Sequence, residues 1–217
     1  MTTYYFTNIK CAVCGKITNT YRCGSSSSFG YSDLDFRPPL RGRHMFYSHL
    51  DVCHNCGFIS CDIENKEYAE VYKKISNTES FKTCDGINFC DKTSADFYRL
   101  YLINRELYGL FETTFHILKE TAWTCDDNKD IDGAIKCRTL ALSFIDDIIA
   151  KSKNADGLNL IKVDFFRRCN MFNEVLNFDK EFTDTHYQNI IKYQKLLARI
   201  KDNKPNSCEE VHYLYET

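Results

Sequence analysis

Proline and glycine are scarce in this sequence, which has three prolines and nine glycines in 217 residues. This scarcity excludes collagen-like chains and turn-rich all-β folds, and it favours long helices. Long apolar runs are also missing, because the most apolar stretch, residues 140–150, is broken by Asp146 and Asp147 and is too short to span a bilayer. The first ten residues lack the basic and apolar regions of a secretory signal. We therefore expect a cytoplasmic protein that does not contact a membrane.

Cysteine and aromatic residues are abundant instead, with 12 Cys, 16 Phe and 14 Tyr. In a small secreted protein the cysteines would indicate disulfides, but a longer chain without a signal favours reduced thiols and a metal site. The net charge is −2, yet residues 1–60 hold six Lys or Arg against three acids, a balance of +3. One zinc ion with four thiolates would contribute −2, so this region would be only slightly basic.

Two Cys-x-x-Cys pairs, each followed by glycine, are the most informative motifs. Two residues between thiols allow a tight turn to direct both sulfur atoms at one ion, and the glycine can adopt the positive φ of such a turn. Two such knuckles supply a closed tetrahedral site, which predicts one structural zinc ion. The alternative is two unrelated redox or core cysteine pairs. The motifs read C-A-V-C-G-K at 11–16 and C-H-N-C-G-F at 53–58, and the predicted ligands are Cys11, Cys14, Cys53 and Cys56.

The 38 residues between the knuckles exceed the spacing of a compact zinc site, so we expect a long loop at residues 25–44. Arg37, Arg41 and Arg43 of this loop are candidate contacts for a phosphate or carboxylate of a partner. The alternative is an Asp–Arg network that holds the loop to its own domain. After the loop, residues 44–52 are predicted to form a strand that leads back to the second knuckle.

Beyond residue 61 the apolar pattern becomes helical. Helices are predicted over 63–75, from residue 93 onward, and over 185–201, with an irregular connection at 76–92. We expect breaks near 108–109, 126–128, 154–157 and 183–184. Cys125, Ile131, Ala134 and Ala141 recur 41 residues later as Phe166, Phe172, Val175 and Phe182. This recurrence favours antiparallel, tetratricopeptide-like helical hairpins, with an ordinary helical bundle as the alternative.

Several stretches together resemble an uncharacterised family of bacterial proteins that carries a domain of unknown function. They are C-A-V-C-G, S-S-S-S-F-G-Y-S-D-L-D-F-R-P-P, C-H-N-C-G-F, A-W-T-C-D-D at 122–127 and D-F-F-R-R-C-N-M-F-N-E-V-L at 164–176. The resemblance implies a zinc ribbon followed by tetratricopeptide-like helices, and it implies no activity. Ala12 departs from the family at a position where many knuckles have proline, and Val175 departs where the helical pattern prefers alanine.

The predicted fold is mainly α with a small N-terminal β zinc ribbon. Its domains are expected at 1–61, a ribbon with the inserted loop, and at 62–217, the helical hairpins. No H-E-x-x-H, phosphate-binding glycine loop, G-x-S-x-G or Rossmann motif is present, so nothing in the sequence requires an enzyme.

Three functions are compatible with this sequence. The preferred hypothesis is a non-enzymatic scaffold or adaptor that binds another protein or peptide through its helices and ribbon. The second is RNA or DNA binding through the ribbon and its arginine-bearing loop, against which the pI of 6.3 argues. The third is a thiol or zinc sensor that uses release of the ion as its switch.

Overall fold

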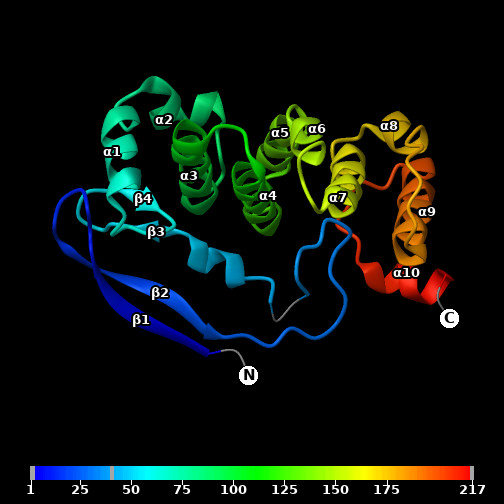
Figure 1. The fold of residues 1–217 in the computed structure, drawn as a ribbon, viewed down its shortest axis with the longest axis horizontal. Helices are drawn as coiled ribbons and strands as arrows, with labels where there is room; N and C mark the ends of the chain where they lie inside the picture. Colours follow the sequence, from blue (N-terminus) through cyan, green and yellow to red (C-terminus); the bar gives the residue numbers. More distant parts are fainter. Residues whose placement is uncertain (1–2, 40–41, 216–217) are drawn as a thin grey trace. The chain divides into compact units, whose positions relative to one another are not determined.

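The computed structural model describes residues 3–39 and 42–215, and it is mainly helical with a small N-terminal β-structure (Figure 1). The predicted fold class is therefore confirmed. None of the helices in the described part of the chain is long and apolar enough to cross a membrane. The elements are β1 Thr3–Lys10, β2 Ile17–Ser25, the 3₁₀ helix η1 Met45–His49, β3 Asp51–Val52, β4 Ile59–Ser60, α1 Lys66–Ile75, α2 Glu79–Thr83, η2 Cys84–Gly86, α3 Lys92–Tyr108, α4 Glu112–Asp127, α5 Ile131–Leu142, α6 Ile145–Ile149, α7 Ala155–Arg168, α8 Phe172–Leu176, α9 Thr185–Arg199 and α10 Cys208–Tyr215.

The chain divides into two compact units, and both are discontinuous in sequence. Unit 1 comprises Met1–Ser27 and Arg41–Cys137, and unit 2 comprises Ser28–Leu40 and Arg138–Thr217. The division after residue 137 differs from the boundary expected after residue 61. Most of the expected loop, residues 28–40, belongs to the helical unit 2 and not to the unit that contains the knuckles.

The β-structure of unit 1 consists of two small antiparallel sheets. β1 pairs with β2 in a long hairpin, in which Phe6 lies opposite Tyr21 and Lys10 opposite Ile17, and β3 pairs with β4. Thr18 and Thr20 are buried, so one face of the hairpin packs within the unit. The other face carries Phe6 and is exposed.

The strand predicted over 44–52 is wrong for most of its length, because residues 45–49 form the 3₁₀ helix η1. The Tyr47 N–H donates to the His44 carbonyl, an i to i+3 bond of this helix. η1 places Phe46 in a buried aromatic cluster, with its ring centroid 5.6 Å from those of Phe97 and Trp123. Packing of this one aromatic side chain has therefore overridden the extended pattern. Trp123 is buried, with 4% of its surface exposed.

The helix ends of unit 1 follow local capping chemistry. α1 begins at Lys66, three residues later than predicted, because the Asn65 side chain accepts hydrogen bonds from the first turn. The connection predicted to be irregular over 76–92 contains α2 and η2. α3 ends at Gly109, which has φ of 79°, and α4 then runs back along α3 as an antiparallel partner. The predicted break near 108–109 is therefore confirmed.

One helix-ending turn occurs three times with the same hydrogen bonds. After α4, the Asp130 N–H donates to the Cys125 carbonyl at 2.8 Å and Lys129 has φ of 60°. After α7, Met171 donates to Phe166 at 2.8 Å and Asn170 has φ of 62°. After α9, Asp202 donates to Leu197 at 2.9 Å and Lys201 has φ of 55°. The first two turns are 41 residues apart, which is the spacing of the recurring apolar residues.

Unit 2 is a set of helices completed by the segment 28–40. The Leu34 N–H donates to the Asn206 carbonyl at 3.0 Å, the Cys208 N–H donates to the Ser32 carbonyl at 2.8 Å, and Asp33 forms a β-bridge with Ser207. Leu34 is 1% exposed. Its side chain belongs to the core formed with residues of α7, α8, α9 and α10. The segment is therefore part of the packed helical unit.

Candidate metal centre

The four predicted cysteine ligands converge on one point in unit 1. The Sγ atoms of Cys11 and Cys56 are 3.7 Å apart, as are those of Cys14 and Cys53, and all four sulfur atoms lie within 4.8 Å of one another. These distances are too long for disulfides, and all four residues are free cysteines. A tetrahedral ion with metal–sulfur distances of about 2.3 Å separates its sulfur ligands by about 3.8 Å. The cluster therefore has the dimensions of a site that could hold a metal ion.

The two knuckles share the same backbone geometry. Gly15 donates its N–H to the Cys11 carbonyl and Gly57 donates to the Cys53 carbonyl, each at 2.8 Å. The two glycines have φ of 71° and 72°, a region that favours glycine over residues with a side chain. The positive φ required at this position of both knuckles explains why each Cys-x-x-Cys pair is followed by glycine.

Neighbouring elements hold the knuckles in place. The Ala12 N–H donates to the Ile63 carbonyl at 2.9 Å, which connects the first knuckle to the segment before α1. The Tyr72 hydroxyl donates to the Cys56 carbonyl at 3.2 Å, which connects the second knuckle to α1 itself. Cys11 and Cys53 are buried, and Cys14 and Cys56 are half-buried. The centre therefore joins the turn of the β1–β2 hairpin to the β3–β4 turn and to α1.

The protein environment affects the thiols unequally. A hydrogen bond from the Lys16 backbone lowers the pKa of Cys14 to about 6. Burial raises the pKa of Cys11 and that of Cys56. A metal ion binds thiolates, so ion binding at this site is accompanied by loss of thiol protons. With four sulfur ligands on a four-coordinate ion, no position is left for a water molecule or a substrate.

No second cluster of this kind is found in residues 3–39 and 42–215, where the four cysteines are the one group of three or more candidate metal-ligating side chains. His54, next to the second knuckle, has an exposed side chain and contributes its backbone N–H to Thr18 Oγ1 at 3.3 Å. His44 precedes η1 and His49 is its last residue. The thiols of Cys84 and Cys90 are free, one buried and one exposed.

The three candidate arginines have different surroundings. Arg37 is 2% exposed and lies in unit 2, where its backbone N–H donates to Asp35 Oδ1 at 3.3 Å. Arg43 is half-buried in unit 1. Arg41 lies outside the described residues. The burial of Arg37 argues against its contact with an external phosphate, and the placement of 28–40 in unit 2 favours a structural role for this part of the loop.

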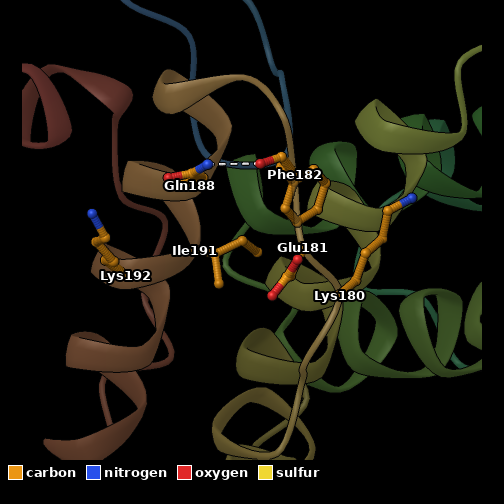
Figure 2. A pocket seen from close by; sticks show the side chains of 6 residues that line it. All are labelled: Lys180, Glu181, Phe182, Gln188, Ile191 and Lys192. Atoms are coloured by element: carbon orange, nitrogen blue, oxygen red, sulfur yellow. Dashed lines mark hydrogen bonds between the residues drawn. The ribbon is translucent and has the colours of Figure 1, made fainter.

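A hollow of about 440 Å³ lies beside α9 in unit 2 (Figure 2). Phe182 and Ile191 are its apolar lining residues, and the Gln188 side chain donates to the Phe182 carbonyl at 2.7 Å. Lys180 forms an ion pair with Asp156 at 2.8 Å. The lining contains no cysteine or histidine, and its one carboxylate, that of Glu181, has no partner for acid–base chemistry within the lining. The hollow therefore lacks a catalytic constellation.

The exposed face of the β1–β2 hairpin was missed by the sequence analysis. Phe6 is 70% exposed and Ile17 is 72% exposed, and Tyr4 and Tyr21 stack on the same face with ring centroids 4.8 Å apart. The signal was present as alternation: Tyr4 and Phe6 are two residues apart, which places them on one side of a strand. We call Tyr4, Phe6, Ile17 and Tyr21 the hairpin aromatic face.

Comparisons with protein-family models, with curated proteins and with solved structures give no match to this chain.

Proposed function

We propose that this chain is a zinc-binding, non-enzymatic scaffold or adaptor that binds a partner protein. The metal assignment is supported by the donor set, because four thiolates in a tetrahedral arrangement favour zinc over the harder cations magnesium and calcium. One ion would be held by Cys11, Cys14, Cys53 and Cys56. Its role is structural: it fixes the hairpin to β3, β4 and α1.

Metal content tests this assignment on the full-length chain. The purified protein is expected to contain one zinc per chain, and Cys56→Ser is expected to lose it. Cys61→Ser is the matched control, because Cys61 is an exposed cysteine outside the cluster and should leave the zinc content unchanged. A full-length protein that binds no zinc, or a Cys56→Ser variant that retains it, would contradict the assignment. Release of zinc by mild peroxide would instead favour the sensor hypothesis.

The hairpin aromatic face is the observation that carries the adaptor proposal. Exposed clusters of large apolar side chains are uncommon on soluble proteins and mark interaction surfaces. Aromatic side chains also contribute disproportionately to protein–protein affinity. The closed metal centre lies at the turn of the same hairpin, so it would hold this face in a fixed orientation, which lowers the entropy lost on binding. The predicted cytoplasmic location is compatible with this role.

Nucleic-acid binding is the second candidate, and one feature favours it. The chain has no acidic residue before Asp33, while Lys10 and Lys16 flank the first knuckle beside the hairpin aromatic face. Aromatic rings next to cations can stack on the bases of single strands. Against this candidate stand the pI of 6.3 and the burial of Arg37.

Capture from a native lysate distinguishes the two candidates. We expect the zinc-loaded protein to retain a protein partner after nuclease treatment, and we expect Tyr21→Ser combined with Ile17→Ser to abolish that capture. Phe111→Ser is the matched control, since Phe111 is an exposed aromatic residue outside the hairpin. Capture that persists in the double variant would contradict the role of this face. Recovery of RNA or DNA that is lost at high salt would favour the second candidate.

A further inference from the structure

The outer edge of β1 is a row of backbone groups without a neighbouring strand. Among the described residues, β1 pairs with β2 in a sheet of two strands. An antiparallel strand turns the N–H and C=O of successive residues alternately toward and away from its partner. The Lys10 N–H donates to Glu64 Oε1 at 3.3 Å, away from β2, whereas the next N–H, that of Cys11, donates to Lys16. The alternation therefore directs the backbone groups of Asn8, Phe6 and Tyr4 away from β2.

This edge lacks the features that prevent strands from pairing with other chains. Natural edge strands are protected by proline, by charged side chains, by bulges or by a covering element. Residues 3–9 read T-Y-Y-F-T-N-I, with no proline and no charge. The one irregularity, a register shift, lies at the first residue of the strand, between Thr3 and Tyr4. The side chains of residues 3–6 are exposed, so the edge is accessible there.

The sequence of this edge fits a second copy of itself. Four residues of β1 have outward backbone groups. The Lys10 N–H is bonded to Glu64, and the other three, Tyr4, Phe6 and Asn8, are centred on Phe6. Two antiparallel copies related by a two-fold axis near Phe6 would place Phe6 opposite Phe6 and Tyr4 opposite Asn8, each within hydrogen-bonding register. Because residues 3–9 carry no charge, the two copies would not repel each other along this stretch, whereas a charged peptide or nucleic acid would find no complementary charge on it.

From this edge we propose that two copies of the chain associate through their β1 strands to form a four-stranded antiparallel sheet, in the order β2–β1–β1–β2. The hairpin aromatic faces of the two copies would become one continuous surface, because Tyr4 and Phe6 lie on the same side of both strands. Apolar rings from both copies would then cover the junction, adding burial of apolar surface to the backbone hydrogen bonds. The proposal goes beyond the adaptor function and does not depend on it.

The oligomeric state of the zinc-loaded, full-length protein tests this proposal. We expect light scattering after gel filtration to give about twice the chain mass of 25.4 kDa. Phe6→Lys should weaken the dimer at least about tenfold, because it places two like charges opposite each other at the two-fold axis, and Asn8→Lys should weaken it less, because its charge would lie opposite Tyr4. Phe111→Lys is the control, since it makes the same change at an exposed phenylalanine away from the hairpin. Circular dichroism and zinc content establish that each variant is folded.

A photoreactive phenylalanine analogue at position 6 supplies the second measurement. We expect it to cross-link two copies, and the same analogue at position 111 to cross-link none. A protein that stays monomeric at about 0.1 mM, where a dimer with a dissociation constant of about 10 μM or less would be mostly assembled, would overturn the proposal. A dimer that survives both lysine variants and gives no cross-link at position 6 would also overturn it. A monomer that still captures a partner through Tyr21 and Ile17 would overturn the dimer and leave the adaptor function intact.

Discussion

Arg22 and Asp51 form a bidentate ion pair that ties β2 of the hairpin to β3. The two terminal guanidinium nitrogens of Arg22 each lie 2.6 Å from a different carboxylate oxygen of Asp51. Asp51 is 1% exposed, so its carboxylate lies inside the protein against Arg22. The carboxylate in turn raises the pKa of Arg22 above its ordinary value. The pair therefore acts with the metal centre to hold the two sheets of unit 1 together.

Replacing Arg22 by methionine should cost about 2–4 kcal/mol of unfolding free energy, because it leaves the Asp51 carboxylate buried without a counter-charge. This loss of unfolding free energy is smaller than the loss expected for a fully buried ion pair, because Arg22 is partly exposed. Arg22→Lys should reduce the unfolding free energy less, since lysine keeps the positive charge although it cannot form the bidentate pair. Urea denaturation of the zinc-loaded protein measures both. Equal losses in the two variants would show that geometry, and not charge, determines the stabilisation.

Leu34→Ala should destabilise unit 2 by about 2–5 kcal/mol, because it removes a fully buried side chain from the core of the helical unit. Amide hydrogen exchange should show faster exchange in α7 and α9. Phe29→Ala changes an exposed residue of the same segment and should have little effect. If Leu34→Ala left α7 and α9 as protected as in the wild type, segment 28–40 would not be part of the packed unit.

Lys129→Gly should stabilise the protein by about 0.5–1 kcal/mol, because Lys129 ends α4 in the left-handed region, where a side chain is strained. Lys136→Gly should destabilise by about 1 kcal/mol, since Lys136 is an exposed residue inside α5. Thermal melts of the two variants at one zinc concentration provide the comparison. A loss of stability in both would mean that the hydrogen bonds of the turn do not compensate for the flexibility of glycine.

Low pH should reduce the unfolding free energy of the protein, partly through protonation of His116. Burial, assisted by the nearby Lys119 charge and opposed by Glu112, lowers the pKa of His116 to about 4. The unfolded chain binds a proton near pH 6.5 and the folded chain does so only near pH 4, so stability present above pH 6.5 is lost as pH falls toward 4. His116→Gln should flatten this part of the profile. The wild-type-minus-variant difference in urea denaturation from pH 4 to 8 is the measurement, because contributions of other groups cancel in it.

The pH dependence of stability expected from His49 has the opposite sign to that expected from His116. A hydrogen bond that His49 donates to the Glu120 carboxylate raises the pKa of His49, so its stabilisation is present at acid pH and is lost as pH rises through the raised value. His49→Gln should therefore lower stability mainly below about pH 6.5. The same direction of change in the two histidine variants would contradict the assigned environments.

The features that sequence reasoning found are those that local chemistry determines. The spacing of the cysteines and the glycines after Cys14 and Cys56 was sufficient to predict the metal cluster, because a knuckle is formed by consecutive residues. Apolar periodicity located the helices, and Asn65 marks the start of α1 in the manner of a capping residue.

The features that it missed depend on distant parts of the chain. Phe46 turns a predicted strand into a 3₁₀ helix because it packs on Phe97 and Trp123. Leu34 belongs to the core of helices more than a hundred residues away, and no local pattern indicates this. Lysine and asparagine at the ends of α4, α7 and α9 occupy positions where glycine is the usual signal, so the repeated turn was not apparent from composition.

Because each unit contains two separate stretches of chain, a cut anywhere between residues 42 and 136 would divide both units at once. The N-terminal fragment would keep the first knuckle and residues 28–40, and the C-terminal fragment would keep the helices of unit 2. The two fragments would then contact each other in both units, because each unit contains residues of both fragments. A protease that nicks an exposed connection such as the one after α1 would convert the protein into two chains that stay associated until both units unfold.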